Sequence, residues 1–536
     1  MTVSDQKKIS KVIGEKYDEI PYVSYPFEYN RPENLRTIGA LFGMNPAKLE
    51  KARVLELGCA AGGNVIRFAE IYPKSYTLGV DLSNVEIKHG LDTIKKLGLT
   101  NIELKCMSIT DLDESHGKFD YIICHGVYSW VPEFVREKIL EVSNKLLAKD
   151  GLAFISYNTL PGWNMVGTVR ELMLYHASNF QTEQDRLSQA KHALSFLKES
   201  LEGAETPHAK FMNDAAVMMA EKEDNYIRHE YLAEENKAFY FHEFIEDARK
   251  HGLEYVGDSD LHRMYVGNLP TNAAEKLGSI NDIVKTEQYI DFIKNTQFRC
   301  TLLCHKDTQL SRNITFERVK QLYLTCIIHP EEPETKDVYT SMAISKFYIN
   351  NNKDVFLSAS SAGLKAVLYA LVDNIGNPLS VKELVDLAFK KAPNVSKEQI
   401  EAEIAQNVAR LIFSGYFKIF ADKPVFKYDI SNKPKISDYA AYQMSICPQN
   451  GKYWFTNQTN SIVAFEEYQS HALKLLDGKH TVDDVKKELF QKLKDGVINA
   501  NRDNKKIEDE KELKEIADTL TMQTLNYLRL NYALVG

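Results

Sequence analysis

Glu56 and the six residues after it have the types and spacing of a ligand-binding turn. The stretch reads Glu-Leu-Gly-Cys-Ala-Ala-Gly and follows a short apolar run, so an acidic side chain precedes a turn of small residues. A turn without bulky side chains lets the backbone approach a ligand closely, where open parallel sheets bind their cofactors. The turn residues expected to touch a ligand are Gly58, Cys59, Ala60 and Gly62.

The charge beside this turn decides between two adenosine ligands. A nicotinamide enzyme prefers Gly-x-Gly-x-x-Gly, with a pyrophosphate at a helix N-terminus. Glu56 would repel a pyrophosphate, but it would attract the ammonium group of S-adenosylmethionine. Asp81 ends the next strand signal and could accept hydrogen bonds from both ribose hydroxyls of either ligand. Together Glu56, the turn and Asp81 predict S-adenosylmethionine as the cofactor, with S-adenosylhomocysteine as its product.

The elements that must position these residues alternate between strand and helix signals. Five short apolar runs, separated by segments of helical length, predict a parallel sheet covered on both faces; they are 54–57, 77–80, 102–105, 121–124 and 152–156. After Trp163 apolar residues recur every three or four positions, and Thr182 with Asp185 resembles a capping box. Strands near 253–257 and 298–306 then complete the sheet, so we interpret the helices between as an insertion.

The C-terminal part has two stretches with a loosely similar order of helix and strand signals. Helices near 364–374, 380–392 and 396–415, followed by an extended pair at 416–430, suggest a winged helix. The helix at 396–415 carries more acidic than basic residues, which argues against DNA binding. The predicted domains are a lid and first part of the core at 1–160, a helical insertion for dimerisation at 161–235, completion of the core at 236–306, a middle winged-helix-like domain at 307–430, and a mostly helical domain at 431–536.

Composition sets outer limits on function. The chain has 536 residues and a net charge of −8, so it has no general attraction to nucleic acid or to anionic lipid. It contains no run of about eighteen apolar residues and no apolar signal segment at its start. Its seven scattered cysteines are typical of reduced thiols. We therefore expect a cytoplasmic protein with no membrane insertion, no nucleic-acid partner and no metal.

Several motifs together resemble one family. PYVSYPFEYNRPENL, VLELGCAAGGN, GVDLS, FDYIICHGVYSWVP, ISYNTLPGW and FRCTLLCH are similar to class I methyltransferases with a methyltransferase regulatory domain, and above all to the rickettsial protein-lysine methyltransferases that modify an outer-membrane autotransporter protein. The resemblance implies a Rossmann-like α/β sheet with a helical insertion, C-terminal winged-helix-like α+β domains, a homodimer, and transfer of methyl groups to lysine ε-amines of a protein substrate.

The sequence departs from the family pattern at two positions. Ala60 stands where a glycine is common, and its methyl group would tighten the approach to the amino-acid arm of the cofactor. Ser108 stands where many class I enzymes place an acidic residue against the adenine amino group. A hydroxyl accepts that hydrogen bond more weakly, so these positions bear on cofactor affinity rather than on cofactor identity.

Candidate residues for catalysis follow the fourth and fifth strand signals. A lysine with an ordinary pKa of about 10.4 must lose its proton before it can attack a methyl group. Tyr128 and Trp130 could hold the lysine cation by cation–π attraction, and His125 could accept the proton or orient a water. Capping of the loop by His125 and plain packing of Trp130 are the alternatives. Aromatic residues of the N-terminal segment could close over the cofactor as a lid.

Three sets of residues summarise the predicted site. The catalytic set is His125, Tyr128 and Trp130. The cofactor-binding set is Tyr25, Glu56, Gly58, Cys59, Ala60, Gly62, Asn64, Asp81, Leu82, Ser108, Ile109, His125 and Gly126. The substrate-binding set is Tyr22, Trp130, Tyr157, Asn158, Trp163 and Glu230. Ordinary burial of the aromatic residues, and a solvated face for Glu230, are the competing interpretations.

Two other functions remain open at this stage. The first is methylation of RNA or of a small molecule, although the strand tip reads His-Gly-Val-Tyr instead of the Asn-Pro-Pro-Tyr or Asn-Pro-Pro-Phe of enzymes that methylate exocyclic base amines. The second is a binding scaffold that senses the cofactor and recruits a protein through the C-terminal modules. Ala60 and Ser108 give the scaffold hypothesis some support.

Overall fold

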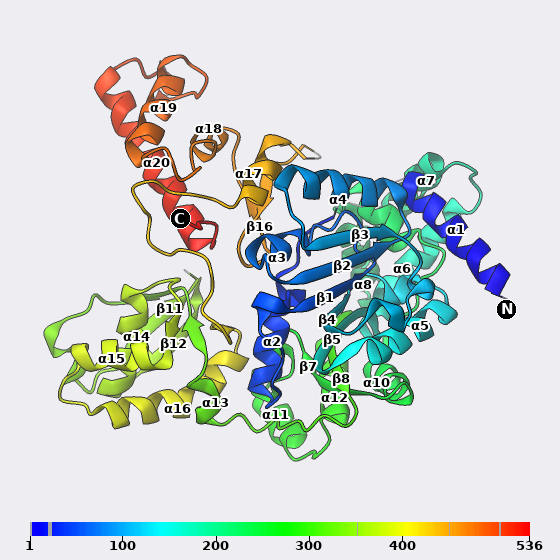
Figure 1. Cartoon of the computed structure of the whole chain (residues 1–536), viewed down its shortest axis with the longest axis horizontal. Helices are drawn as coiled ribbons and strands as arrows, with labels where there is room; N and C mark the ends of the chain where they lie inside the picture. The colour runs from blue at the N-terminus through cyan, green and yellow to red at the C-terminus, as the bar shows by residue number, and fades with distance from the viewer. Residues whose placement is uncertain (1–2, 20–23, 351, 450, 503–504) are drawn as a thin grey trace.

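The computed structural model describes residues 3–19, 24–350, 352–449, 451–502 and 505–536. A sheet with the strand order β3-β2-β1-β4-β5-β8-β7 forms its centre, and β6 pairs with β5 (Figure 1). Strands β1 to β5 are parallel, whereas β8 runs antiparallel to both β5 and β7. The strands are β1 (Arg53–Leu57), β2 (Tyr76–Asp81), β3 (Ile102–Cys106), β4 (Phe119–Cys124), β5 (Leu147–Leu160), β6 (Phe239–Tyr240), β7 (Leu253–Asp258) and β8 (Phe298–His305).

The apolar runs of the sequence become the buried strands of this sheet. Every residue of β1 after Arg53 is buried, as expected for a parallel strand that is covered on both faces. The pairing of β1 with β2 and with β4 places their carboxyl ends side by side. The predicted Rossmann-like α/β sheet is therefore confirmed, including the two strands near 253–257 and 298–306 that complete it; the structure adds that β8 is antiparallel to its neighbours.

Helices connect and cover the strands. They are α1 (Val3–Glu19), α2 (Pro32–Leu41), α3 (Ile66–Ile71), α4 (Asn84–Leu97), α5 (Glu133–Lys145), α10 (Phe241–Lys250), α11 (Thr271–Gly278) and α12 (Ile283–Lys294). Ser83 caps α4 by accepting a hydrogen bond from the Glu86 N–H, and Gly98 ends the helix in a left-handed conformation. Among the described residues, no helix combines the length and apolar character that crossing a membrane requires.

The helical insertion has a hydrophobic core of its own. It contains α6 (Gly162–Ala177), α7 (Glu183–Ser200), α8 (Pro207–Ala220), the short α9 (Asp224–Tyr226) and a π-helical turn (Ile227–Tyr231). Thr182 caps α7 by accepting from the Asp185 N–H, as its sequence predicts. Leu187 and Leu194 are buried against α6 and α8. This part of the apolar seam therefore packs within the subunit, not against another one.

Over its described residues, the middle domain combines four α-helices with two small sheets. Its elements are α13 (Phe316–Val319), β9 (Tyr323–Thr325), β10 (Ile328–Pro330), β11 (Ser345–Ile349), β12 (Asn352–Ala359), α14 (Ala362–Asp373), β13 (Leu379–Ser380), α15 (Val381–Lys391), α16 (Lys397–Phe413) and β14 (Lys418–Phe420). The expected extended pair at 416–430 is wrong in its second half. The chain after Phe420 bonds to α2 instead, since the Ala421 N–H donates to Thr37 and Arg36 pairs with Asp422.

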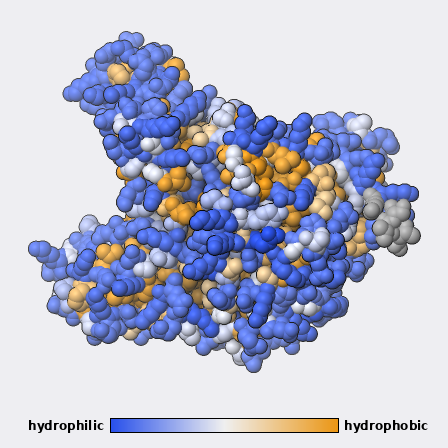
Figure 2. Space-filling view, in the orientation of Figure 1, coloured by the Kyte–Doolittle hydropathy of each residue, from blue (hydrophilic) through white to orange (hydrophobic). Residues whose placement is uncertain are grey.

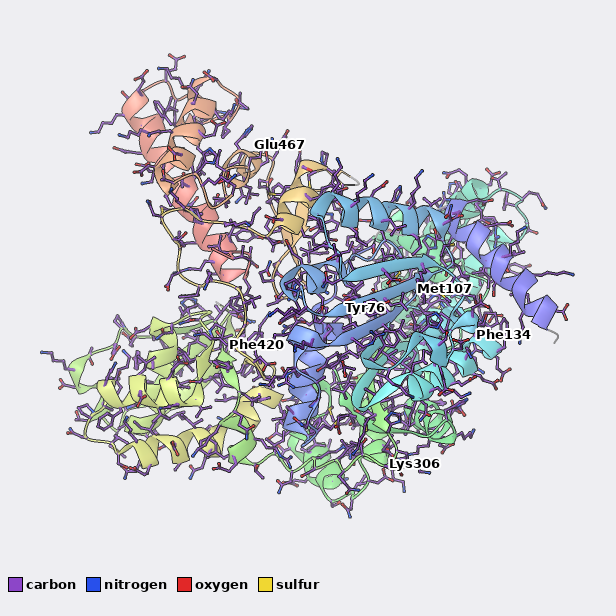
Figure 3. The ribbon with its side chains drawn as sticks, in the orientation of Figure 1. Tyr76, Met107, Phe134, Lys306, Phe420 and Glu467 are labelled. Atoms are coloured by element: carbon purple, nitrogen blue, oxygen red, sulfur yellow. The ribbon has the colours of Figure 1, made fainter. Side chains whose placement is uncertain are left out.

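The C-terminal domain contacts the core through α17 and through the β15–β16 hairpin. It contains α17 (Asp438–Ser445), β15 (Trp454–Thr456), β16 (Ile462–Ala464), α18 (Gln469–Leu473), α19 (Val482–Lys494), β17 (Asn501–Arg502), β18 (Lys505–Lys506) and α20 (Glu510–Leu530). Figure 2 shows an open notch between this domain and the middle domain. Phe420 and Glu467 mark the middle and C-terminal domains on the side toward the core (Figure 3).

A buried charge cluster holds the closing strands to α12. The Arg299 guanidinium on β8 donates to both carboxylate oxygens of Asp291, at 2.8 and 3.0 Å, and to Glu287 at 2.8 Å. Asp258 lies 3.9 Å from the same guanidinium, and all four side chains are almost completely buried. Arg299 is therefore the main cation for three buried carboxyl groups, and the charge of Arg263 also opposes the rise that burial causes in the pKa of Asp258 and Asp291.

Candidate functional site

The turn after β1 adopts the conformation that its small residues permit. Gly58, Ala60 and Gly62 all have left-handed backbones, with φ of 74°, 45° and 76°. A Cβ atom on Gly58 would lie 2.4 Å from the Val127 side chain, so no larger residue fits there. The Ala60 N–H donates to the Asp81 carboxylate at 2.8 Å, which ties the turn to the end of β2.

Replacing Ala60 by glycine is expected to stabilise the protein by about 0.5–1 kcal/mol, because an alanine pays a steric cost in the left-handed region that glycine does not. Thermal unfolding of the cofactor-free protein measures this effect. Ala61→Gly is the matched control. Ala61 is not among the described residues with a left-handed backbone, so glycine at this position should lower the stability of the protein. A lower melting temperature for Ala60→Gly than for the unchanged protein would contradict the argument.

Glu56 presents a carboxylate oxygen to the turn. The side chain is only 4% exposed, and its Oε1 accepts from the Asn64 amide at 2.9 Å. Its Oε2 is buried and has no hydrogen-bond partner among the described residues. Burial raises the pKa of Glu56 to about 8, and the nearby Asp81 adds to this effect. A cationic group placed against Oε2 would satisfy the oxygen and favour the ionised carboxylate.

A cavity of about 430 Å³ lies beside the ends of β2 and β3. Its lining includes the predicted Leu82 and Ser108, and it is closed on one side by α1; the lining residues are Ser10, Lys11, Gly14, Glu15, Asp18, Leu82, Ser108, Thr110 and Asp111. Ser108 bonds to Thr110 at 2.7 Å. Asp111 supplies an acidic group that our sequence reasoning sought only at position 108. The signal that could have found it is the acidic residue three positions later in Ser-Ile-Thr-Asp.

The remaining predicted cofactor residues surround the turn. Asp81 accepts from the N–H groups of Ala60 and Ser83, and burial raises its pKa. Cys59 and Ile109 are buried in the core beneath the site. Gly126 is exposed at the end of β4 with a left-handed φ of 68°.

His125 is held on both sides of its ring. Its Nδ1 lies 2.8 Å from the Ser156 hydroxyl and its Nε2 lies 3.2 Å from the Tyr29 hydroxyl. The rings of Phe27 and Phe154 pack around it. Burial lowers the pKa of His125 to about 3. The imidazole is therefore neutral and occupied by neighbours, so this placement favours a positioning role over the predicted role as proton acceptor.

Tyr128, predicted as catalytic, and Tyr157, predicted as a substrate contact, both lie in the core. Tyr128 packs edge-on against Phe244, and Tyr157 stacks on Phe244 at 4.0 Å and bonds to Thr301. Trp130 is half-buried after β4, and Trp163 packs against the core of the insertion. The placement of the two tyrosines favours a packing role for both.

Asn158 and Glu230, two residues of the predicted substrate-binding set, lie close together and are linked through Asn236. Asn158 donates to the Asn236 side chain at 3.0 Å, and Asn236 donates to the Glu230 carbonyl at 2.9 Å. Burial raises the pKa of Glu230 to about 7, while Asn158 and Arg170 act in the opposite direction. Burial, together with the charges of Asp81 and Glu230, raises the pKa of Tyr17 on α1 to about 12. Tyr17 also stacks on His229, with ring centres 5.7 Å apart, and the next residue, Asp18, accepts from the Ser83 hydroxyl, so α1 contacts the segments of both carboxyl groups.

The N-terminal segment crosses the turn, as expected of a lid. The Ser24 hydroxyl accepts from the Gly63 N–H, and the Phe27 N–H donates to Asn64. Tyr25 packs on Trp454 of the C-terminal domain, with ring centres 5.4 Å apart. Tyr22 lies outside the described residues. The structure thus adds three parts that the sequence did not indicate: α1, Asp111 and a contact with the C-terminal domain.

Comparison with known proteins gives three family matches along the chain. Residues 48–228 match a methyltransferase domain, residues 223–305 match a "Predicted methyltransferase regulatory domain", and residues 432–532 match the "PKMT, C-terminal winged helix domain". The winged-helix match therefore falls on the domain that we predicted as mostly helical at 431–536, and it confirms winged-helix character in the C-terminal part of the chain. The winged-helix-like domain at 307–430 stays a prediction.

Two relatives are similar over nearly the whole chain. The uncharacterized protein RP789 of Rickettsia prowazekii is 42% identical, over 94% of this chain and 91% of its own length. The solved structure of PKMT2 from Rickettsia typhi is 45% identical, with a TM-score of 0.89, over 96% of this chain and 100% of that one. A second PKMT2 structure, in complex with AdoHcy, is 46% identical with the same TM-score.

Proposed function

Because this chain belongs to the PKMT family of S-adenosylmethionine-dependent protein-lysine methyltransferases, we propose that it methylates lysine side chains of an outer-membrane or surface protein. The observation that carries the cofactor side is the unpartnered Oε2 of Glu56 beside the glycine turn. The open notch between the middle and C-terminal domains is a concave surface of the kind that a polypeptide substrate would use (Figure 2).

The residues present fit the methyl donor. S-adenosylmethionine supplies, when bound, a methyl group on a positively charged sulfur. Glu56 would hold its ammonium group, Asp81 would accept from its ribose hydroxyls, and the cavity lined by Leu82, Ser108 and Asp111 would hold its adenine. The N-terminal segment over the turn would exclude water from this arrangement. The main task of the protein is alignment of two reactants.

Glu230 is the best-placed group for the incoming lysine. The neighbouring His229 stacks on Tyr17 of α1, and the charge of Glu230 adds to the effect of burial in raising the pKa of Tyr17. An ionised carboxylate there would hold the lysine cation and accept its proton. His125 does not serve this purpose, because both of its ring nitrogens already have partners. Trp130 and Asn158 would frame the same entry, and Asn158 would keep Glu230 in place.

Glu230→Gln is expected to lower kcat/KM for the protein substrate about 100-fold, in the range of a lost general base, without changing cofactor affinity. The rate of the unchanged enzyme should rise with pH through about 7, because only the ionised Glu230 accepts a proton. Glu235→Gln, at an exposed position nearby, is the control. Equal kcat/KM values for Glu230→Gln and Glu235→Gln would show that Glu230 takes no part in the reaction.

Transfer of labelled methyl groups tests the proposed function directly. The purified chain is incubated with labelled S-adenosylmethionine and recombinant surface-protein fragments, and acceptor peptides are analysed by mass spectrometry. We expect label on lysine ε-nitrogens that resists ribonuclease. Label on RNA or on carboxyl groups would contradict the proposal, and cofactor binding without any turnover would support the scaffold alternative.

We also propose that the chain acts in the cytoplasm as a homodimer joined by its insertion. All seven cysteines are free thiols, as in a reducing compartment. Tyr175 on α6 and Phe196 on α7 are 77% and 65% exposed, and a partner subunit bound to the insertion would cover these two large side chains. Sedimentation as a monomer at micromolar concentration would contradict the dimer.

A further inference from the structure

The tip of the β15–β16 hairpin is buried although it is polar. It consists of residues 457–461, Asn-Gln-Thr-Asn-Ser, which we call the docking turn. Asn457, Gln458, Thr459 and Asn460 are at most 3% exposed. The Asn457 side chain accepts from the N–H groups of Thr459 and Ser461, both at 2.8 Å, and Asn460 has a left-handed φ of 58°. The turn is therefore held in one shape by its own bonds.

The docking turn ends on the residues that hold Glu56. The Asn460 amide donates to the Asn64 side-chain oxygen at 2.6 Å, and it also lies 3.3 Å from the Asn64 carbonyl and 3.2 Å from the Phe27 carbonyl. The Asn64 amide nitrogen in turn donates to Glu56 Oε1 at 2.9 Å. Two hydrogen bonds thus connect the C-terminal domain with the carboxylate beside the glycine turn.

This chain of bonds fixes which way the Asn64 amide points. Its oxygen receives the short bond from Asn460 and a longer one, at 3.3 Å, from the Phe27 N–H. Its nitrogen is therefore left facing Glu56. Without the Asn460 donor, the longer bond and the bond to Glu56 hold the amide with one strong donor fewer. A flipped amide would set its oxygen against a carboxylate oxygen.

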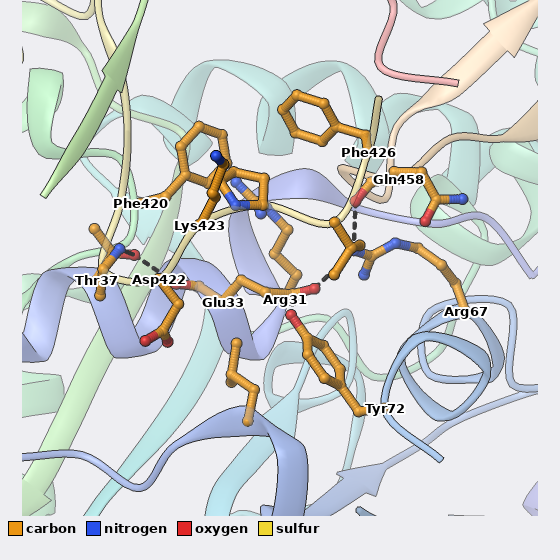
Figure 4. A pocket seen from close by; sticks show the side chains of 14 residues that line it. Arg31, Glu33, Thr37, Arg67, Tyr72, Phe420, Asp422, Lys423, Phe426 and Gln458 are labelled. Carbon is orange, nitrogen blue, oxygen red and sulfur yellow. Dashed lines mark hydrogen bonds and ion pairs between the residues drawn. The ribbon is translucent and has the colours of Figure 1, made fainter. Parts of the chain in front are cut away.

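A second contact holds the same turn to the start of α3. The Arg67 guanidinium donates to the Gln458 carbonyl and pairs with Glu33 at 2.6 Å (Figure 4). The Ser461 hydroxyl donates to Glu28 at 3.0 Å. Arg67 is almost completely buried, and it follows the cofactor turn directly in sequence. The docking turn thus contacts both the segment after the glycines and the N-terminal lid.

We propose that Asn460 is a positioning residue for the methyl donor: through Asn64 it orients Glu56 so that Oε2 faces the ammonium group. The inference rests on the proposed function. It gives the C-terminal domain a part in cofactor binding, beyond any contact with the protein substrate. The bond from Asn64 also opposes the rise in the pKa of Glu56 that burial causes, so it favours the ionised carboxylate that the ammonium group requires.

Asn460→Gly tests this role, because glycine keeps the left-handed backbone and removes only the side chain. The Kd for S-adenosylmethionine should rise about five- to tenfold, which corresponds to one hydrogen bond. The pH range over which the affinity for S-adenosylmethionine increases should shift to higher pH. The reason is that a less well oriented Asn64 would lower the pKa of Glu56 by a smaller amount. Ser461→Ala is the control, because it removes a bond of the same turn that does not involve Asn64.

The readouts separate positioning from simple docking of the domain. Asn460→Asp, which also tolerates the left-handed conformation, sets an acceptor against acceptors and should weaken binding more than glycine does. Melting temperatures of all variants are recorded alongside. Equal Kd values and pH profiles for Asn460→Gly and Ser461→Ala would overturn the inference. Equal values for the two variants would leave the proposed function intact, provided that the unchanged chain binds the cofactor and methylates lysine. If the unchanged chain did not bind the cofactor, the proposed function itself would be refuted.

Discussion

Replacing Glu56 by glutamine is expected to raise the Kd for S-adenosylmethionine about 100-fold, with an equal fall in kcat/KM. The carboxylate is buried, and its Oε2 has no partner among the described residues, so a cofactor ammonium group would be its main compensation. Charged hydrogen bonds contribute about 1.5–3 kcal/mol, and about 2.7 kcal/mol corresponds to 100-fold in affinity. Glutamine keeps the shape of the side chain and removes its charge. Isothermal titration calorimetry measures the change.

Glu50→Gln is the control for this experiment, because Glu50 is exposed and lies before β1. Its affinity should equal that of the unchanged protein. If Glu56→Gln also left the Kd within a factor of three of that value, the carboxylate would not hold the ammonium group and the cofactor assignment of the turn would fail.

The pH dependence of binding provides a separate prediction for the same carboxylate. Burial raises the pKa of Glu56 to about 8, so the cofactor-free protein carries a proton there at neutral pH. Binding of the ammonium group must release that proton, and affinity should rise up to about tenfold per pH unit between pH 5.5 and 7.5. The upper limit stays below the pH at which an α-amino group loses its proton, about 7.7–8.0. Glu56→Gln should show a flat profile.

The same shift affects the stability of the cofactor-free protein. A carboxyl group whose folded pKa is raised stabilises the fold at pH values below its unfolded pKa, and this contribution is lost as the pH rises through the folded value. The contribution of Glu56 should therefore decline between about pH 4.5 and pH 8. Added cofactor should reduce this decline. If the stability difference between the unchanged protein and Glu56→Gln increased with pH over this range, the raised pKa of Glu56 would be contradicted.

Arg299→Met is expected to cost about 3–5 kcal/mol of stability, because it leaves buried carboxyl groups without their cation. The arginine makes a two-bond contact with Asp291 and a further bond with Glu287, and Asp258 lies 3.9 Å away. Calorimetric unfolding of the variant should show a transition at a markedly lower temperature. The loss should shrink toward pH 5, since protonated carboxyl groups no longer need compensation.

Arg249→Met supplies the matched control for this result. Arg249 also makes a two-bond contact with one carboxylate, Glu254, but the two side chains are 43% and 25% exposed. An exposed pair of this kind contributes about 0.2–1 kcal/mol. Similar losses in the two arginine variants, or a loss for Arg299→Met that does not change with pH, would show that burial of the cluster is not the cause.

Local sequence patterns were sufficient to predict the central strands, the start of α7 and the cofactor-binding turn. Apolar runs predicted the central strands, because a strand buried in a parallel sheet must be apolar over its whole length. Thr182 predicted the start of α7, because an N-cap bonds to backbone only three residues away. Glu56, Gly58 and Asp81 could be recognised for the same reason: their roles depend on positions at strand ends that the sequence already marks.

The same reasoning could not assign side chains whose partners are distant in sequence. Tyr128 and Trp130 are two residues apart, yet Tyr128 is buried against Phe244 while Trp130 is only half-buried. His125 follows a strand tip as predicted, but burial lowers the pKa of its ring, and Tyr29 and Ser156 occupy both ring nitrogens. The extended segment after Phe420 bonds to α2, because a helix nearly 400 residues earlier offers the partners.

By itself, then, the sequence determined the sheet, the glycine turn with its acidic neighbours, and the order of the domains' elements, since each depends on spacing within a few residues. Only the tertiary structure decided which of the predicted aromatic residues face the core, that α1 contacts both His229 and Ser83, and that Asn460 reaches Asn64 across 396 positions. The physical reason is that burial and hydrogen-bond partnership are properties of packed elements, and no local period encodes which distant element will supply the partner.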